Sequence, residues 1–251
     1  MVKQSQEKVP WTIQQTFLGI LLTVTPWVAL TLIAGLTSTS TPTHPMPDVQ
    51  RSIVTFISSV IIEGSYVIAP FYFAYVGTRS LRPHWRSAFE ALGFRRFPIV
   101  KALIQILLFT LIILFANNLF QQVVSYFHLN LQTNDQVILK LAREAPITTY
   151  ITLFVAVFIA PICEEIFFRG FVFAGFLKEM PVVWAILFSA LFFGVAHADF
   201  GSFTVLFIIG IFLAYIRYST NSIWPGIFLH MINNGLSALI IILYMQHIIH
   251  V

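Results

Sequence analysis

Four long segments of the chain carry no charged residue, or only one. They are residues 9–47, 52–78 with Glu63 inside, 102–134 and 218–251. Each is longer than the ~20 apolar residues that cross a bilayer as a helix. Of 251 residues, 58% are hydrophobic and 10% charged, whereas about a quarter are charged in soluble domains. The sequence therefore predicts a polytopic membrane protein.

Apolar runs and the turn residues between them predict an all-α bundle of about seven transmembrane spans. We place these helices at 14–36, 53–77, 99–126, 147–178, 181–198, 202–217 and 223–246. The first run is read as a retained helix, and the Ser-, Thr- and Pro-rich linker 37–50 as an exposed loop. Residues 135–144 mix apolar and basic side chains and suit a short helix at the membrane interface. We divide the chain into residues 1–146, N-terminal helices and loops, and residues 147–246, a bundle that holds the candidate site.

Basic residues are distributed unequally between the two ends of the spans. Ten are expected on the side of the amino terminus and three on the other side, while Arg169 lies inside a span. The ten are Lys3, Lys8, Arg79, Arg82, Arg86, Arg95, Arg96, Lys101, Lys178 and Arg217. The three are Arg51, Lys140 and Arg143. Cytoplasmic loops carry the excess of Lys and Arg. We therefore expect a cell-membrane protein with a cytoplasmic amino terminus, and a lipid bilayer rather than nucleic acid as the partner of its basic residues.

The fourth predicted span carries Glu164, Glu165 and Arg169 in its middle. Three such groups make insertion of the helix into a bilayer less favourable by roughly 8–10 kcal/mol. The nine Ile, Leu, Val and Phe residues of 147–162 favour insertion by only ~4 kcal/mol. These side chains must therefore face the bundle interior, where ionisable residues mark functional sites.

Helical spacing suggests which charges pair. Glu165 and Arg169 are four residues apart and share a face, so they are predicted to form an ion pair, structural or functional. Glu164 lies about 100° round the helix and gains no such partner. We expect Glu164 to be the carboxylate that is free for chemistry.

Two histidines lie within or at the edge of late spans, His197 and His230. From the turn at 179–181, Glu164 lies ~23 Å and His197 ~26 Å along their helices, at nearly the same level. From the next turn, Asn234 lies ~20 Å and His230 ~14 Å, so His230 is expected to be shallower than Glu164. His230 and Asn234 share a face, and Asn233 is expected to point elsewhere.

Taken in order, these residues form three motifs: Glu164-Glu165-x-x-x-Arg169, Phe193-x-x-x-His197 and His230-x-x-x-Asn234. Together they resemble the motifs of the CPBP (CAAX protease and bacteriocin-processing, or Abi) family, which includes the type II CAAX prenyl endopeptidase. The resemblance covers about residues 150–240. It implies an intramembrane endopeptidase in which Glu164 and His197 activate a water and His230 and Asn234 stabilise the oxyanion, with Glu165 and Arg169 in support. The substrate it implies is a peptide or membrane-anchored protein.

Metal dependence is left open by the residue types. Glu164, His197 and His230 could hold a catalytic zinc with a position left for water. The chain has no HExxH sequence, the usual helical zinc-protease arrangement. We favour a metal-free glutamate mechanism without a cofactor.

Two other functions remain possible from the sequence. Some CPBP family members protect bacteria from bacteriocins, and this role does not require catalysis. A proton-coupled transporter could use Glu63, Glu164 and the histidines as a relay, although the chain shows no internal repeat. No motif accounts for Glu63, and Asn234 could simply join two helices through hydrogen bonds.

Overall fold

The computed structural model describes residues 9–37, 46–80, 84–129, 131 and 134–249. Its helices, in chain order, are α1 Ile13–Thr37, α2 Asp48–Gly77, α3 His84–Ala91, α4 Ile99–Tyr126, α5 Asn134–Glu144, α6 Pro146–Phe154, η1 Val155–Ile159, α7 Ala160–Glu165, η2 Ile166–Val172, α8 Phe173–Glu179, α9 Val182–Ala196, α10 Phe203–Thr220 and α11 Trp224–Met245. Segments α6 to α8 follow one another as the long helix Pro146–Glu179. The predicted all-α fold is confirmed.

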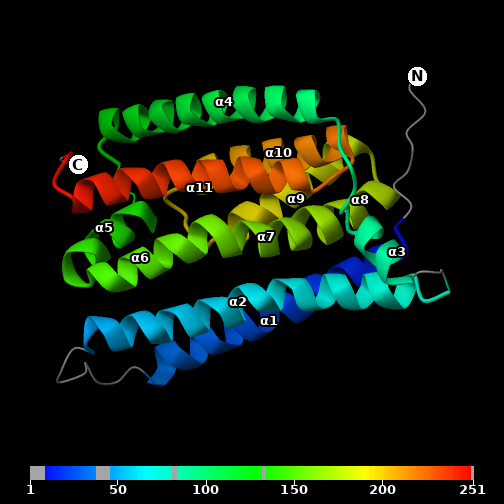
Figure 1. Ribbon diagram of the computed structural model, residues 1–251, viewed down its shortest axis with the longest axis horizontal. Helices are drawn as coiled ribbons and strands as arrows, with labels where there is room; N and C mark the ends of the chain where they lie inside the picture. Colours follow the sequence, from blue (N-terminus) through cyan, green and yellow to red (C-terminus); the bar gives the residue numbers. More distant parts are fainter. Residues whose placement is uncertain (1–8, 38–45, 81–83, 130, 132–133, 250–251) are drawn as a thin grey trace.

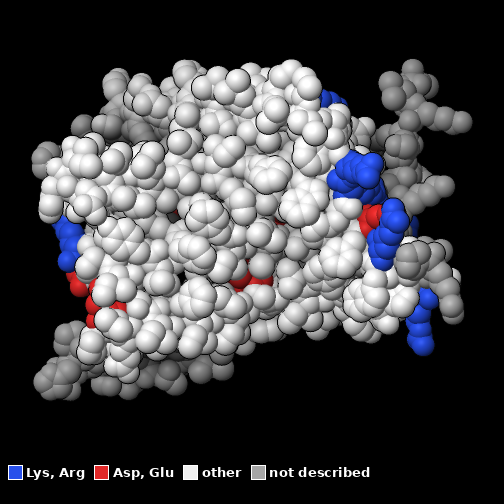
Figure 2. Space-filling view, in the orientation of Figure 1, with Lys and Arg blue, Asp and Glu red and all other residues white. Residues whose placement is uncertain are grey.

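Among the residues that the structure describes, five helices are long and apolar enough to cross a bilayer: α2, α4, the long helix, α10 and α11. The other two predicted spans correspond to shorter apolar helices, Ile13–Ala29 within α1 and Val182–Ala196. Figure 2 shows Lys, Arg, Asp and Glu mostly toward the two ends of the molecule, with a broad belt between them that is uncharged apart from a few acidic atoms near its centre. Large apolar side chains of α4 such as Val100, Leu107 and Phe115 are exposed. This is the surface of a multi-pass membrane protein.

The long helix lies in the middle of the bundle. In Figure 1, α1 and α2 cover one side of it, while α4 lies on the far side of α10 and α11. The carboxylate of Asp48 at the start of α2 accepts hydrogen bonds from the backbone N–H groups of Ile147, at 2.8 Å, and Thr148, at 3.0 Å. An acidic side chain at a helix N-terminus is favourable because the first N–H groups have no partner within the helix. This contact positions α2, which begins five residues before the predicted span.

Two segments of the long helix, η1 and η2, are π-helical and wider than an α-helix. They flank α7, which carries Glu164 and Glu165, and every residue of η2 is buried. Such bulges inside α-helices are frequent at functional sites. The predicted extent of this helix is confirmed, but the regular 3.6-residue turn assumed for it is interrupted on both sides of the acidic pair.

Helix α9 is shorter than predicted: it ends at Ala196 instead of residue 198. Ala198 has a φ of 49°, and the Asp199 side chain accepts a hydrogen bond from the backbone of Ser202 at 3.0 Å, so the chain turns at once. Fifteen residues rise only about 23 Å, less than the hydrocarbon core. Residues 197–202 are thus non-helical, and within them Asp199 is buried whereas Phe200 is exposed.

Some sequence predictions fall outside the described residues. These are the positions of Lys3, Lys8 and Arg82, and residues 38–45 of the predicted linker. The short helix expected at 135–144 is present as α5.

Candidate active site

The charged residues of the fourth predicted span are all buried. Glu165 and Arg169 have no exposed side-chain surface, and Arg169 Nη1 lies 3.1 Å from Glu165 Oε1. Arg169 Nη2 also donates to the backbone carbonyl of Gly210 at 3.3 Å, and its guanidinium lies 4.3 Å from the ring centre of Phe193. The predicted Glu165–Arg169 pair is confirmed, and it links the long helix to α9 and α10.

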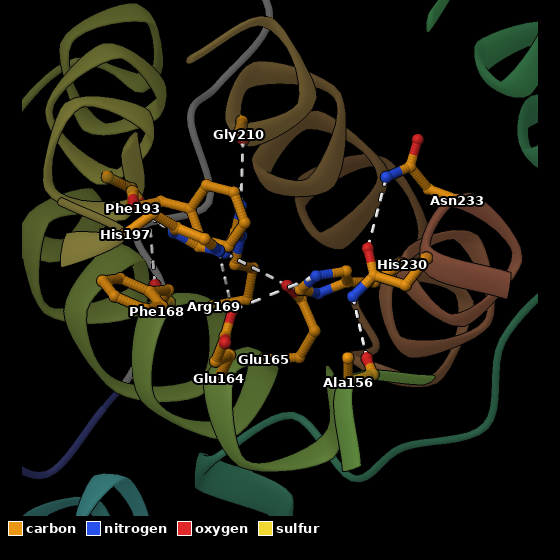
Figure 3. A network of polar contacts seen from close by, with 12 residues as sticks. Ala156, Glu164, Glu165, Phe168, Arg169, Phe193, His197, Gly210, His230 and Asn233 are labelled. Carbon is orange, nitrogen blue, oxygen red and sulfur yellow. Dashed lines mark hydrogen bonds and ion pairs between the residues drawn. The ribbon is translucent and has the colours of Figure 1, made fainter. Parts of the chain in front are cut away.

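Glu164 faces two imidazole rings from other helices. Its Oε2 atom lies 3.7 Å from His197 Nε2 and 3.9 Å from His230 Nε2. Figure 3 shows Glu164, His197 and His230 converging from three helical segments. These separations are too long for direct hydrogen bonds, and contacts in this range suit a bridging water molecule. Glu164 Oε2 itself has no hydrogen-bond partner among the described residues.

The ring of His197 is oriented by the helix that ends beside it. Its Nδ1 lies 2.8 Å from the backbone carbonyl oxygen of Phe193. A carbonyl oxygen only accepts hydrogen bonds, so Nδ1 is the donor in this contact. In the neutral imidazole Nε2, the atom that faces Glu164, is then a free acceptor.

His230 lies at the level of Glu164, contrary to the depth estimate. Besides the Glu164 contact, its Nδ1 is 3.5 Å from Glu165 Oε1. This estimate of depth was wrong because the turn before α11 packs against the segment that follows α3. There the backbone N–H of Ile223 donates to the carbonyl of Gly93 at 3.0 Å, and Ser222 Oγ donates to that of Arg95 at 2.8 Å.

Asn234 is held by hydrogen bonds on both sides of its amide. Its Nδ2 donates to the Ala156 carbonyl of η1 at 2.9 Å, and its Oδ1 accepts from Asn233 Nδ2 at 3.3 Å. One N–H of Asn234 remains available. The expectation that Asn233 points elsewhere was wrong, because both asparagines line the pocket described next.

A pocket of about 250 Å³ opens beside the histidines. His197 and His230 line one part of it, and residues of α4, α10, α11 and the long helix line the rest. Glu164 is not among its lining residues, although 12% of its side chain is exposed. Its Oε2 atom is buried behind the two imidazoles, which line the pocket.

Three contributors to the site had no role assigned to them from the sequence. The Phe193 carbonyl orients His197, and the Gly210 carbonyl binds Arg169. Gly226 leaves room for Glu165: a Cβ atom there would lie 2.8 Å from Glu165 Oε2. Phe193, four residues before His197 on the same helix face, carried a recognisable signal. The two glycines did not, because their roles depend on contacts between separate helices.

Glu63 of α2 is a further acidic group in the middle of a span. Its Oε2 atom is buried and has no hydrogen-bond partner among the described residues, and its charge interacts with that of Glu164. Figure 2 shows acidic atoms in the centre of the uncharged face, in the region where Figure 1 places α2 beside α7. Glu63 and Glu164 are therefore close enough to interact electrostatically.

The donor set was also tested as a metal site. Among the residues that the structure describes, no group of three or more His, Cys, Asp or Glu side chains has the arrangement needed to hold a metal ion. The buried guanidinium of Arg169, which shares Glu165 with His230, adds a positive charge close to the place a dication would take.

Comparison with known proteins points to the same part of the chain that holds the candidate active site. Residues 146–236 match the family described as type II CAAX prenyl endopeptidase Rce1-like. This match agrees with the resemblance of the three motifs to the CPBP family. The matched region begins with the long helix and ends within α11, so it includes all seven residues named in the three motifs and excludes α4.

One curated relative aligns with part of the chain. A Bacillus subtilis (strain 168) protein described as "Putative membrane peptidase YdiL" is 31% identical over 101 residues, which is 40% of this chain and 40% of that protein. The chain thus spans about two fifths of the length of the curated relative it matches. No solved structure matches the chain.

Proposed function

We propose that this protein is an intramembrane endopeptidase that hydrolyses peptide bonds of membrane-associated peptides or proteins with a water activated by Glu164 and His197. The observation that carries this proposal is the position of Glu164 Oε2, within 4 Å of the nitrogens of two histidines whose rings line a pocket. The match of residues 146–236 to an endopeptidase family supports it.

In the proposed mechanism, a water molecule lies between Glu164 Oε2 and His197 Nε2. Both atoms accept hydrogen bonds when the carboxyl is ionised and the imidazole neutral, so they engage the two O–H bonds of the water and direct a lone pair toward the substrate carbonyl. One of the two bases takes the proton as the carbon–oxygen bond forms. That proton passes to the leaving nitrogen as the carbon–nitrogen bond breaks.

The developing oxyanion needs hydrogen-bond donors that are already in place. We assign this role to the Nε2–H of His230 and the remaining N–H of Asn234. Glu165 faces Nδ1 of His230 at 3.5 Å, so its carboxylate supports a protonated ring there. The hydrogen bonds to Ala156 and from Asn233 limit rotation of the Asn234 amide.

We further propose that no metal or other cofactor takes part, and that the protein lies in the cell membrane with its amino terminus in the cytoplasm. The buried Arg169 guanidinium beside the site supports the first statement, and the excess of basic residues at one end of the spans supports the second. The lipid bilayer is the expected partner of the apolar belt.

Isosteric variants test the proposal. Purified protein, Glu164→Gln and His197→Asn are incubated in lipid nanodiscs with a pool of peptides from membrane proteins, and the products are identified by mass spectrometry. Each variant should reduce kcat by about 10²–10⁴-fold, the usual contribution of a general base. Glu144→Gln, in exposed α5, is the matched control and should retain activity.

Three results would count against this function or its mechanism. Absence of cleavage by the wild-type protein together with bacteriocin protection by Glu164→Gln would favour an immunity role without catalysis. Proton uptake driven by a solute gradient, lost in Glu63→Gln and Glu164→Gln, would favour transport. Loss of cleavage after treatment with a strong chelator, restored by zinc, would overturn the metal-free mechanism.

A further inference from the structure

The pocket has amide and hydroxyl groups on two facing walls. Asn117 and Gln121 line it from α4, and Asn233 and Ser237 line it from α11, beside Asn234. Asn117, Gln121 and Ser237 form no hydrogen bond with any described residue, and Asn233 uses one N–H to reach Asn234. In an otherwise apolar bundle these groups are available to a ligand.

Their spacing along the helices suits a particular ligand. Asn117 and Gln121 are four residues apart, as are Asn233 and Ser237, so each pair lies on one helix face with about 6 Å between its members. Alternate residues of an extended peptide are about 6.6 Å apart and direct their main-chain groups to the same side. Each wall can therefore contact successive main-chain groups of a peptide that runs along the pocket.

A peptide that enters the bilayer in an extended form has main-chain N–H and C=O groups that neither water nor a helix satisfies. A bond inside an intact helix is shielded from an attacking water, so a substrate segment must unwind before hydrolysis. The pocket also has apolar walls, with Ile113, Leu206, Ile209 and Ile240 among them, and Asp199 and Ser202 line it as well. Polar groups for the main chain and apolar surface for side chains thus occur together.

We propose that Asn117 and Gln121, with Asn233 and Ser237 opposite, bind the main chain of an extended apolar peptide and hold it beside the two histidines. This inference rests on the proposed function and adds the form in which the substrate binds: unwound, apolar and recognised through its backbone. Helix α4 lies outside the matched region 146–236, so half of this subsite belongs to a part of the chain that the family match does not cover.

The pocket extends from the histidines toward one end of the bundle. The lining residues of α4 lie in its second half, those of α11 run from His230 to Ile241, and Ile138 of α5 lines the pocket too. Figure 1 shows α4 and α11 running the same way, toward the end of the molecule that holds α5. The bound peptide therefore extends from the histidines toward the α5 end.

Binding without hydrolysis provides the test. Glu164→Gln protein in nanodiscs is titrated with a fluorescein-labelled octapeptide of alternating alanine and leucine, and with the same peptide N-methylated at its main-chain amides. Adding Asn117→Leu and Gln121→Met together removes about two hydrogen bonds at nearly constant side-chain size. Binding of the unmethylated peptide should weaken about 5- to 150-fold. The methylated peptide should bind weakly to both proteins and show little difference between them.

Helix α4 itself offers the matched control. Asn118 and Gln122 form their own hydrogen bond at 2.7 Å and do not line the pocket, so Asn118→Leu with Gln122→Met should leave binding within about twofold. If the Asn117/Gln121 double variant fails to fold, Asn117→Leu and Gln121→Met are measured singly, with about 2- to 12-fold weakening expected for each.

The results that would overturn this inference differ from those that would overturn the proposed endopeptidase function. No binding of the octapeptide, equal binding by the double variant, or an equal loss for both peptides would overturn the inference. If the wild type cleaves no peptide but the pocket variants still weaken binding of the unmethylated octapeptide selectively, the subsite stands and the endopeptidase proposal fails.

Discussion

Glu164 and Glu165 are adjacent in the chain but have different surroundings. Glu165 is fully buried between Arg169 and His230, and Gly226 leaves room for its carboxylate. Glu164 keeps 12% of its side chain exposed, and its Oε2 faces only imidazole nitrogens. The first carboxylate is therefore suited to holding the site together, and the second to reacting with water.

Removing one member of the Glu165–Arg169 pair leaves a buried charge without its partner. We expect Arg169→Met to lower the free energy of unfolding by about 3–5 kcal/mol, measured by equilibrium unfolding in mixed micelles. The double variant Glu165→Gln/Arg169→Met should recover most of this loss, because a buried ion pair can be replaced by neutral groups at little cost.

Cleavage by the same variants separates stability from chemistry. The double variant should cleave at least tenfold more slowly than the wild type even where it is stably folded, because His230 Nδ1 no longer faces a carboxylate. A double variant as unstable as Arg169→Met alone would contradict the assignment of these residues as a compensating pair. Full activity in a stable double variant would remove Glu165 from the proposed site.

Helices α9 and α10 pack together closely enough to exclude a side chain. A Cβ atom on Gly210 would lie 2.9 Å from Ala190 Cα and 3.0 Å from its Cβ. Close approach at small residues is a common form of helix association in membranes. It also places the Gly210 carbonyl where Arg169 can reach it, so this contact supports the ion pair of the site.

A substitution pair tests this packing. Gly210→Ala should destabilise the protein by about 1–3 kcal/mol, the usual cost of overpacking, and should lower activity because α10 moves away from Arg169. Adding Ala190→Gly removes the opposing methyl group and should restore part of both losses. Thermal unfolding and peptide cleavage in nanodiscs would measure them. Gly64→Ala serves as the control, since nothing lies within 4 Å of a Cβ at that position.

The whole bundle has two unlike ends. The start of α1, α3 and most basic side chains lie at one end, while α5 and the end of α11 lie at the other (Figures 1 and 2). The pocket extends toward the α5 end. The orientation of the protein in its membrane therefore decides from which side a substrate peptide reaches the histidines.

Cysteine labelling can determine that orientation. In a Cys163→Ala background, which removes the only cysteine, Ser80→Cys and Lys140→Cys place single thiols at exposed positions near opposite ends. With the amino terminus in the cytoplasm, a membrane-impermeant maleimide added to intact cells should label Lys140→Cys and spare Ser80→Cys. Both should react after the cells are permeabilised. The reverse pattern in intact cells would invert the proposed topology.

Much of the molecule follows from local properties of the chain. Long uncharged segments have one stable form in a bilayer, the helix, so the all-α fold and the spans were predictable from hydrophobicity and length. The Glu165–Arg169 pair was predictable because two residues four apart on a helix meet wherever that helix lies. The level of Glu164 and His197 could be counted from a shared turn.

What only the tertiary structure decided depends on how separate helices dock. The depth of His230 required the docking of residues 222–223 against 93–95, which no count along α11 contains. The pocket wall formed by Asn117 and Gln121 required α4 to pack beside α10 and α11. In lipid, the position of one helix against another depends on close side-chain packing, and hydrophobicity does not specify it. The sequence alone thus determined the helices and the polar residues they carry, and tertiary packing determined which of those residues meet.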